Sequence, residues 1–165
     1  MKDETLRDAA VPDLTIDAPA SPVKVSWPHL ILGAIGFAIS GYSLHVHNLI
    51  KQGEDSGCGF TNTINCDKVL ASDYGKFLSI PLGIWGMVYF VIVILTAVTS
   101  KGSTATLKQT VGWQLAVASA GFLTSVALTY ISKVLIGAYC PICMATHATT
   151  TLLFVVSLYS YFKAR

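Results

Sequence analysis

Four cysteines are the residues of this chain best suited to chemistry. Cys58 and Cys66 lie in a polar segment, and Cys140 and Cys143 form a C-P-I-C motif at the start of an apolar segment. Two residues three positions apart at the start of a helix share one face, within the Cα separation that a disulfide tolerates. Because the sequence has no other cysteine, two pairings account for every thiol. The pattern favours a relay of electrons between two dithiol pairs.

Pro141 indicates that Cys140 lies close to a helix N-terminus, since proline is favoured at the first helical position. The positive end of the helix macrodipole stabilises a thiolate, which predicts a lowered pKa for Cys140. Cys143, one turn deeper, faces a less polar setting. This asymmetry suits a pair in which one sulfur exchanges with protein thiols and the other meets a lipid-soluble acceptor.

Two other interpretations of the cysteines need to be considered. Four thiolates could hold zinc, but structural zinc sites prefer two short C-x-x-C knuckles, whereas seven residues separate Cys58 from Cys66. We therefore expect no metal. Two fixed disulfides could instead brace a scaffold, although a bond within C-P-I-C closes too short a loop to constrain the unfolded chain much.

The composition places these cysteines in a membrane protein. Hydrophobic residues make up 53% of the 165 residues and charged residues only 12%, well below the roughly 25% charged residues of a soluble domain. Four apolar stretches are each long enough to cross a bilayer. They are residues 28–49, 77–98, 111–131 and 140–162. We expect an all-α integral membrane protein whose four transmembrane helices, within residues 28–165, form a bundle.

The remaining segments set the boundaries of this bundle. Residues 1–27 are acidic and proline-containing, without the basic start and apolar core of a signal peptide, and we interpret them as a disordered cytoplasmic tail. His29, His45 and His47 are near the ends of the first span and are expected at the membrane interface. The distribution of lysines and arginines predicts the orientation of the bundle in the membrane, with seven on the side of the termini and four on the other side. This bias puts the termini in the cytoplasm and both cysteine pairs outside it, where disulfides persist.

Residues 51–76 form a long loop that carries the first cysteine pair. Loops of this length are usually functional or disordered, and a cysteine pair favours the former. Asn65 followed by helix-forming residues predicts a short helix that starts beside Cys66. By contrast, residues 101–110 have the small, polar composition of a connection without chemistry. Residues 133–139 are a short connection that makes the third and fourth spans a hairpin.

The order of these motifs resembles the bacterial branch of the vitamin K epoxide reductase family over residues 27–162. The matching features are C-x7-C in the first loop, a serine six residues past the second cysteine, and C-x-x-C opening the fourth span. The sequence segments that contain these features are Asn-Cys-Asp-Lys-Val-Leu at 65–70, Ser72, Tyr74-Gly75, Ile80-Pro81 and Tyr-Cys-Pro-Ile-Cys at 139–143. The DsbB family also has four spans and two cysteine pairs, but there the C-x-x-C comes first.

The resemblance implies a role for each cysteine. Cys140 and Cys143 would be the pair beside a quinone, ubiquinone or menaquinone, with Cys143 facing the ring. Cys66 would exchange with Cys140, and Cys58 would meet a soluble thiol partner. This chain carries no thioredoxin-like domain after the fourth span, so we expect a separate DsbA-like periplasmic partner with a thioredoxin fold. We therefore expect the protein to be a quinone-dependent thiol oxidase of the inner membrane that supports disulfide formation and binds lipid but no nucleic acid.

Three further residues are candidates for the quinone site. Ser72 matches the family serine near the pocket, although a hydroxyl that closes a turn is an equally good reading. Trp85 is expected to line either the bundle or the pocket. His147 lies four residues after Cys143 and should share its helix face, where it could donate a hydrogen bond to a quinone oxygen or simply bridge helices.

Two departures from the family bear on the alternative functions. The vitamin K-reducing animal enzymes resemble this chain but hold their ligand with an asparagine on the second span and a tyrosine at the position of His147. The second span here lacks asparagine. A reductase of vitamin K or its epoxide is thus the alternative enzyme, and a disulfide-braced tetraspan scaffold without turnover is the alternative of another class.

Overall fold

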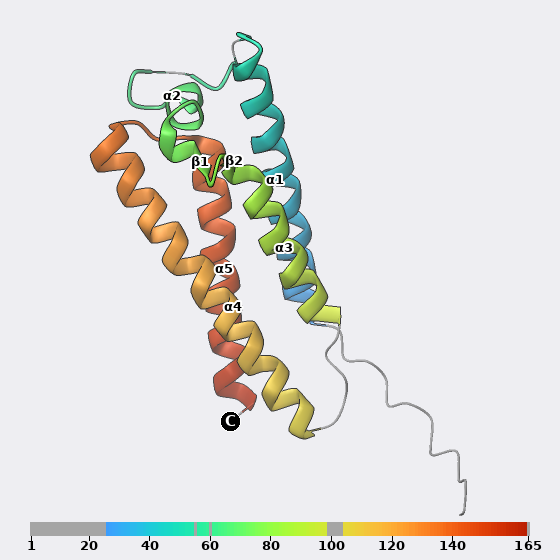
Figure 1. Ribbon diagram of the computed structural model, residues 1–165. Coiled ribbons are helices and arrows are strands. Elements are labelled where there is room, and N and C mark those ends of the chain that lie inside the picture. Colours follow the sequence, from blue (N-terminus) through green and yellow to red (C-terminus); the bar gives the residue numbers. More distant parts are fainter. Residues whose placement is uncertain (1–25, 55, 60, 99–103, 165) are drawn as a thin grey trace, which may run out of the picture.

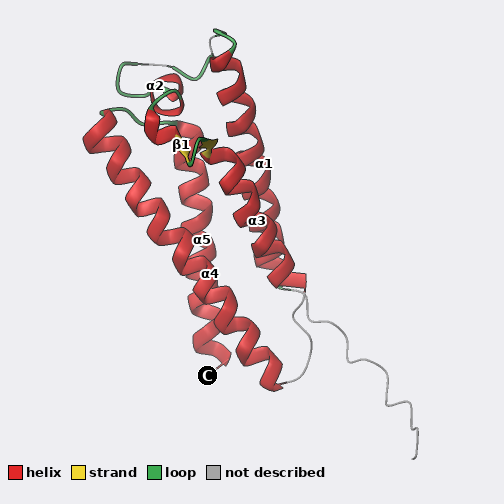
Figure 2. Ribbon diagram, in the orientation of Figure 1, coloured by secondary structure: helices red, strands yellow, loops and turns green. Residues whose placement is uncertain are grey.

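The protein is an elongated helical bundle with a small cap at one end (Figure 1). The computed structural model describes residues 26–54, 56–59, 61–98 and 104–164. The long helices are α1 (Trp27–Lys51), α3 (Leu82–Val98), α4 (Thr104–Ile131) and α5 (Pro141–Ala164). The shorter elements are α2 (Cys66–Leu70), the 3-10 turn η1 (Asp73–Gly75), the strands β1 (Lys76–Phe77) and β2 (Ile80–Pro81), and the π-helical turn η2 (Ser132–Ile136). Figure 2 shows α2 and the hairpin at the same end of the bundle.

In the part of the chain that the structure describes, three helical segments are long and apolar enough to cross a membrane, namely α1, residues 109–136 and α5. The fourth apolar helix, α3, has 17 residues, which corresponds to about 25 Å at 1.5 Å per residue and lies at the lower limit for a span. The predicted start of this span at Phe77 is wrong. Leu78 and Ser79 have positive φ angles of 54° and 65° and turn the chain into the β1–β2 hairpin, so the helix begins only at Leu82.

The third long helix extends past both of its predicted ends. It begins at Thr104, inside the stretch expected to be a loop, and continues beyond Ile131 through the π turn to Ile136. Gly137 then ends the helix in a left-handed conformation with φ 68°, and the Ala138 N–H donates to the carbonyl of Ser132 at 3.2 Å. This is the usual glycine stop for a helix. The connection to α5 is therefore shorter than the predicted 133–139.

Small residues let the helices approach closely. The helix α1 packs against α3, α4 packs against α5, and α1 also contacts α5. A Cβ atom added to Gly36 of α1 would overlap the ring of Phe90 in α3, and one added to Gly33 would lie 2.8 Å from Ile94. Glycine at a crossing point is typical of helix contacts in membranes. Phe90, Val93 and Leu153 form the buried centre of this packing.

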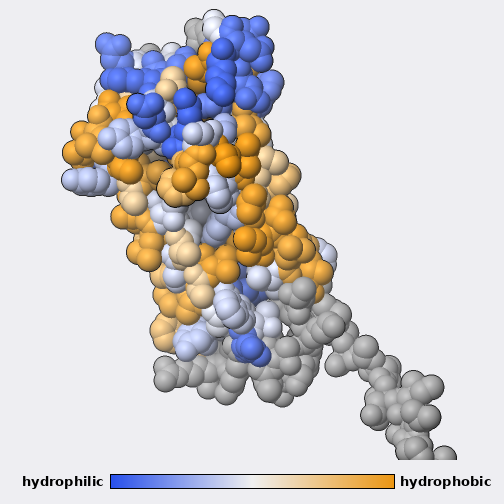
Figure 3. Space-filling model, viewed as in Figure 1, coloured by the Kyte–Doolittle hydropathy of each residue, from blue (hydrophilic) through white to orange (hydrophobic). Residues whose placement is uncertain are grey.

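The outer surface matches a protein surrounded by lipid. Many large apolar side chains of the long helices are exposed, including Leu123, Tyr159 and Phe162. Figure 3 shows hydrophobic residues as a band along the helices and hydrophilic residues gathered at the end that carries α2. In water such a surface would be an aggregation liability, whereas in a bilayer it faces acyl chains. The molecule is an integral membrane protein.

The predicted end of the tail needs correction, and two histidines near the ends of α1 are buried. Trp27, assigned to the tail, is the first residue of α1; residues 1–25 of that tail lie outside the described part of the chain. Two of the three histidines expected at the membrane interface, His29 and His47, are only 2% and 3% exposed. His29 shares hydrogen bonds with Ser26 (2.7 Å) and Ser157 (2.8 Å). Such inward polar contacts join the ends of helices within the bundle.

Candidate redox site at the loop end of the bundle

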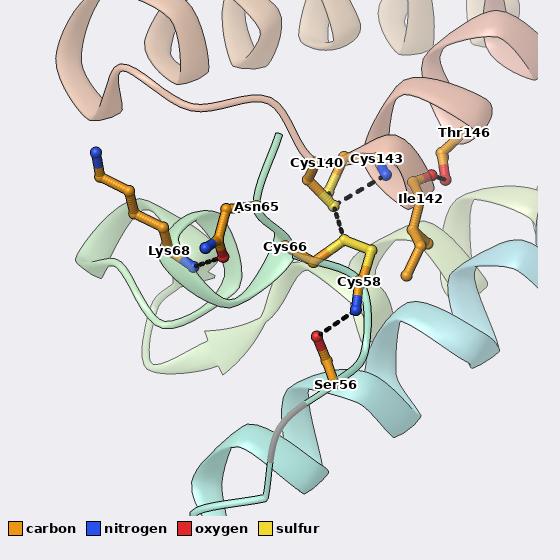
Figure 4. The surroundings of a disulfide bond; sticks show 9 residues. All are labelled: Ser56, Cys58, Asn65, Cys66, Lys68, Cys140, Ile142, Cys143 and Thr146. Carbon is orange, nitrogen blue, oxygen red and sulfur yellow. Dashed lines mark hydrogen bonds between the residues drawn. A yellow bond between two sulfur atoms is a disulfide. The ribbon is translucent and has the colours of Figure 1, made fainter. Parts of the chain in front are cut away.

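The four sulfur atoms lie in one row (Figure 4). Cys58 and Cys66 form a disulfide with a Cα–Cα distance of 5.5 Å, and Cys140 and Cys143 are free thiols. The Cys140 Sγ lies 3.5 Å from the Cys66 Sγ and 2.7 Å from the Cys143 Sγ. The two inner cysteines, Cys66 and Cys140, are buried, while the two outer ones are partly exposed. The structure thus brings the two cysteine pairs together.

Helix α2 positions Cys66, as predicted from its Asn cap. The Asn65 side chain accepts a hydrogen bond from the backbone N–H of Lys68 at 3.0 Å and so satisfies one of the free donors at the start of the helix. Cys66 is the first helical residue, and it packs with Val69 and Leu70 of the same helix in a small core. The short helix thus holds the Cys66 sulfur inside the protein, facing α5.

A backbone bridge aligns the two inner cysteines. The N–H of Tyr139 donates to the carbonyl of Thr63 at 2.7 Å, and the N–H of Asn65 donates to the carbonyl of Tyr139 at 2.9 Å. The next residues along the two segments are Cys66 and Cys140. Parallel pairing fixes register, so this contact places the two sulfurs side by side. Sequence reasoning missed it, because the bridge has no side-chain pattern of its own.

The start of α5 stabilises the Cys140 thiolate. Pro141 is the first residue of the helix, as predicted, and the backbone N–H of Cys143 donates to the Cys140 Sγ at 3.2 Å. The hydrogen bond from the Cys143 thiol is the largest influence and lowers the pKa of Cys140, with help from the backbone N–H groups of Cys143 and Ile142; burial and the charge of Asp67 act against this. The direction is the predicted one, but the neighbouring thiol contributes most.

A cavity of about 310 Å³ lies among the four long helices beneath this thiol pair. Cys143 lines it from α5, and Val69 and Leu70 of α2 line it at the loop end. Most of the other lining groups are apolar. Trp85 also lines the cavity, as anticipated, and its indole N–H donates to the carbonyl of Phe77 at 3.3 Å. An apolar cavity with few polar groups is the usual character of a site for a small organic ligand.

His147 and Ser72 occupy different places relative to this cavity. His147 lines it, one helical turn from Cys143, and the buried Nδ1 atom of the ring has no hydrogen-bond partner among the described residues. Ser72 is not among the lining residues; its hydroxyl donates to the carbonyl of Val69 at 2.7 Å and closes the end of α2. The structure therefore brings His147 and Trp85 to the cavity beside Cys143, and Ser72 to the element that covers it.

Two polar residues of the cavity were missed by sequence reasoning. The Ser40 Oγ on α1 and the Tyr89 Oη on α3 are buried and lack a hydrogen-bond partner among the described residues. A polar side chain within an apolar span is energetically costly and often marks a functional site. Ser40 and Tyr89 could have been recognised from the sequence on that ground. Their side chains add two hydroxyl groups to a cavity that Cys143, Trp85 and His147 also line, together with several serine and threonine residues.

The arrangement is suited to stepwise thiol–disulfide exchange. A thiolate at Cys140 lies next to the disulfide sulfur of Cys66, and exchange proceeds by attack of a thiolate on a disulfide sulfur. The described residues include no group of three or more His, Cys, Asp or Glu side chains that could hold a metal ion. Partly exposed Cys58 forms one end of the row, and Cys143 at the cavity forms the other.

Comparison with known proteins gives one family. The model of the vitamin K epoxide reductase family matches residues 27–158, which include all four cysteines and the four long helices up to the last turns of α5. No curated protein matches the chain.

Proposed function

The chain belongs to the vitamin K epoxide reductase family, and on that premise we propose that it is a membrane thiol oxidase that passes electrons from a thioredoxin-fold partner to a quinone. The observation that carries the proposal is the row of four sulfurs that runs from a partly exposed cysteine to an apolar cavity. Each neighbouring pair in this row is close enough for one exchange step. A fixed brace would not need free thiols beside its disulfide.

The first exchange takes electrons from the partner. A partner thiolate attacks the Cys58 sulfur, the bond to Cys66 breaks, and Cys66 leaves as a thiolate. The second partner thiol then attacks the mixed disulfide, which oxidises the partner and releases Cys58. Cys58 suits this role because it is more exposed than Cys66, which is 0% exposed. We propose a DsbA-like partner, whose oxidised form would introduce disulfides into secreted proteins.

The second exchange is internal. The Cys66 thiolate attacks Cys140 of an oxidised Cys140–Cys143 pair, which frees Cys143, and Cys58 then attacks Cys66 and frees Cys140. The products are a Cys58–Cys66 disulfide and two thiols on α5. This is the same distribution of bonds that the structure has. A lowered pKa makes Cys140 a good leaving group in this step.

The last transfer takes place at the cavity. A bound quinone would be the electron acceptor, because it can take up the two electrons and two protons released when Cys140 and Cys143 form a disulfide. Cys143 and His147 line the cavity, and we assign a carbonyl oxygen to the His147 Nδ1 because this atom has no hydrogen-bond partner among the described residues. Trp85 offers an aromatic face at the wall. Ser72 supports the site indirectly, since its hydroxyl holds the end of α2, whose Val69 and Leu70 cover the cavity.

The same geometry supports a proposal for the membrane arrangement. We propose that α3 spans the bilayer as well, which gives four spans and puts both ends of the bundle's chain on one side. Figure 1 supports this, since α1 begins and α5 ends at the end opposite α2. With the termini in the cytoplasm, the cysteines would face the periplasm of a bacterial inner membrane. That compartment keeps disulfides oxidised.

Anaerobic quinone reduction by the purified protein tests the proposal. The reductants are a reduced DsbA-like protein and, separately, a small dithiol that can reach the inner pair. We expect Cys143→Ala to abolish turnover with both, because the sulfur beside the cavity is lost. Cys58→Ala should abolish turnover only with the protein partner. Met144→Ala, a change at an exposed neighbour, is the control and should leave the rate unchanged. If the wild-type protein reduces no quinone with either reductant, the proposal fails and the braced scaffold is the better account.

A further inference from the structure

The cavity has polar groups on two facing walls. Helix α3 packs against α1 and α4, and α5 packs against the same two helices, so α3 and α5 are diagonal partners across the bundle. Tyr89 lines the cavity from α3 and His147 lines it from α5. The Tyr89 Oη and the His147 Nδ1 are both buried without a hydrogen-bond partner among the described residues. A buried donor left unsatisfied is costly, which argues that a ligand completes these bonds.

The two groups lie at a similar depth. Both helices begin at the end of the bundle that carries α2 (Figure 1). Tyr89 is seven residues after Leu82, the start of α3, and His147 is six residues after Pro141, the start of α5. At 1.5 Å per residue they lie about 10 Å and about 9 Å along their helices, and Cys143 lies about 3 Å along α5. The polar groups therefore form one level of the cavity, below the reactive thiol.

The position of the Tyr89 hydroxyl is built into the packing. A Cβ atom added to Gly121 of α4 would overlap the hydroxyl and the ring carbon that bears it. The Tyr89 ring also meets Phe90 edge to face, with ring centroids 5.0 Å apart. The phenol thus reaches the cavity wall only because α4 has a glycine opposite it. The Tyr89 hydroxyl is closely packed and has no hydrogen-bond partner among the described residues, so it is a candidate for ligand recognition.

We infer that the Tyr89 hydroxyl donates a hydrogen bond to one carbonyl oxygen of the quinone while the His147 ring serves the other. This inference rests on the proposed function and adds the residue that orients the ring. A quinone with its two carbonyl oxygens on opposite sides of the ring needs donors on facing walls, as Tyr89 and His147 are. Tyr89 is a binding residue with no part in the thiol exchange.

Quinone binding to the fully oxidised protein tests this role without turnover. The probe is a short-chain benzoquinone, titrated against the fluorescence of the protein, since Trp85 lines the cavity. Tyr89→Phe keeps the ring packing and removes only the hydroxyl. We expect its dissociation constant to rise about 3- to 10-fold, the size expected for one hydrogen bond. Tyr159→Phe, at a residue 67% exposed on α5, is the matched control and should bind as the wild type does.

Two further variants make the test specific. Gly121→Ala should weaken binding as well, because the added methyl displaces the phenol; thermal unfolding checks that the bundle is intact. Ser40→Ala removes a second cavity hydroxyl that has no hydrogen-bond partner among the described residues and should weaken binding less than Tyr89→Phe. Equal affinity of wild type and Tyr89→Phe, or a larger loss in Ser40→Ala, would overturn this inference and leave the proposed function standing. Absence of quinone binding by the wild type would instead overturn the proposed function.

Discussion

The Sγ atoms of Cys66 and Cys140 lie 3.5 Å apart although 74 positions separate them in the chain. Two hydrogen bonds between the backbone of Tyr139 and residues 63 and 65 hold the segments on which they lie. Neither cysteine has to move far to exchange with the other. The site is therefore organised around its inner pair, with the outer cysteines leading to solvent and to the cavity.

Asn65→Ala should slow exchange between the two cysteine pairs. The Asn65 side chain caps α2 through the N–H of Lys68, and loss of such a cap costs about 0.5–2 kcal/mol. With α2 loosened, Cys66 is held less firmly beside Cys140. Rapid-quench trapping of the thiols after addition of a reduced partner would report the rate of internal exchange.

Asn65→Ser is the control for this change, because serine is nearly as good a cap as asparagine. It should retain most of the wild-type exchange rate. An equal loss of rate in both variants would show that the amide acts through something other than the cap.

Alkylation of the reduced protein should begin at a lower pH for Cys140 than for an ordinary thiol, whose pKa is about 8.5. The pKa of Cys140 is lowered chiefly by the hydrogen bond from the Cys143 thiol. Since only the thiolate reacts, a lower pKa moves the rise of the rate with pH to lower pH. Cys143→Ala should move it back up, as measured by peptide mass spectrometry after timed alkylation.

Asp67→Asn should shift the dependence of the Cys140 alkylation rate on pH to lower pH, opposite to the shift expected for Cys143→Ala. The negative charge of Asp67 raises the pKa of Cys140, so its removal lets the thiolate form at lower pH still. A downward shift in Cys143→Ala, or an upward shift in Asp67→Asn, would contradict this account of the thiolate.

The features that could be predicted from the sequence are local ones. Asn65 predicts the start of α2 and Pro141 the start of α5, because a cap and a fixed φ act within one turn. The composition likewise shows that the helices lie in a membrane. His147 could be placed beside Cys143 because residues four apart share a helix face.

The features that could not be predicted depend on contacts between distant segments or on backbone angles. Hydropathy cannot distinguish the apolar hairpin at 76–81 from the first turn of a span. The predicted start of the second span was wrong for that reason. The bridge at Tyr139 and the fit of Tyr89 against Gly121 join segments far apart in the chain. Ser72 matched the motif, yet only the fold shows that its hydroxyl bonds to Val69.

His147→Ala should weaken quinone use more than it affects the thiol reactions. The ring lines the cavity one helical turn from Cys143, and its Nδ1 atom has no hydrogen-bond partner among the described residues. Loss of one hydrogen bond should raise the quinone KM about 3- to 10-fold. The rate of internal disulfide exchange should stay unchanged, since His147 lies about two helical turns along α5 from Cys140, which exchanges with Cys66. An exchange rate that fell together with the quinone affinity would point to a structural role for His147.

Gly36→Ala should destabilise the bundle, whereas Gly41→Ala on the same helix should not. A Cβ atom at Gly36 would overlap the ring of Phe90, which is 0% exposed and belongs to the buried centre of the bundle. Overpacking of this kind costs about 1–3 kcal/mol. A Cβ atom at Gly41 meets no atom of the described residues within 4 Å, so alanine there only adds helix propensity. Thermal unfolding in detergent should therefore separate the two variants, and equal midpoints would mean that the contact between α1 and α3 is looser than the close approach of Gly36 and Phe90 requires.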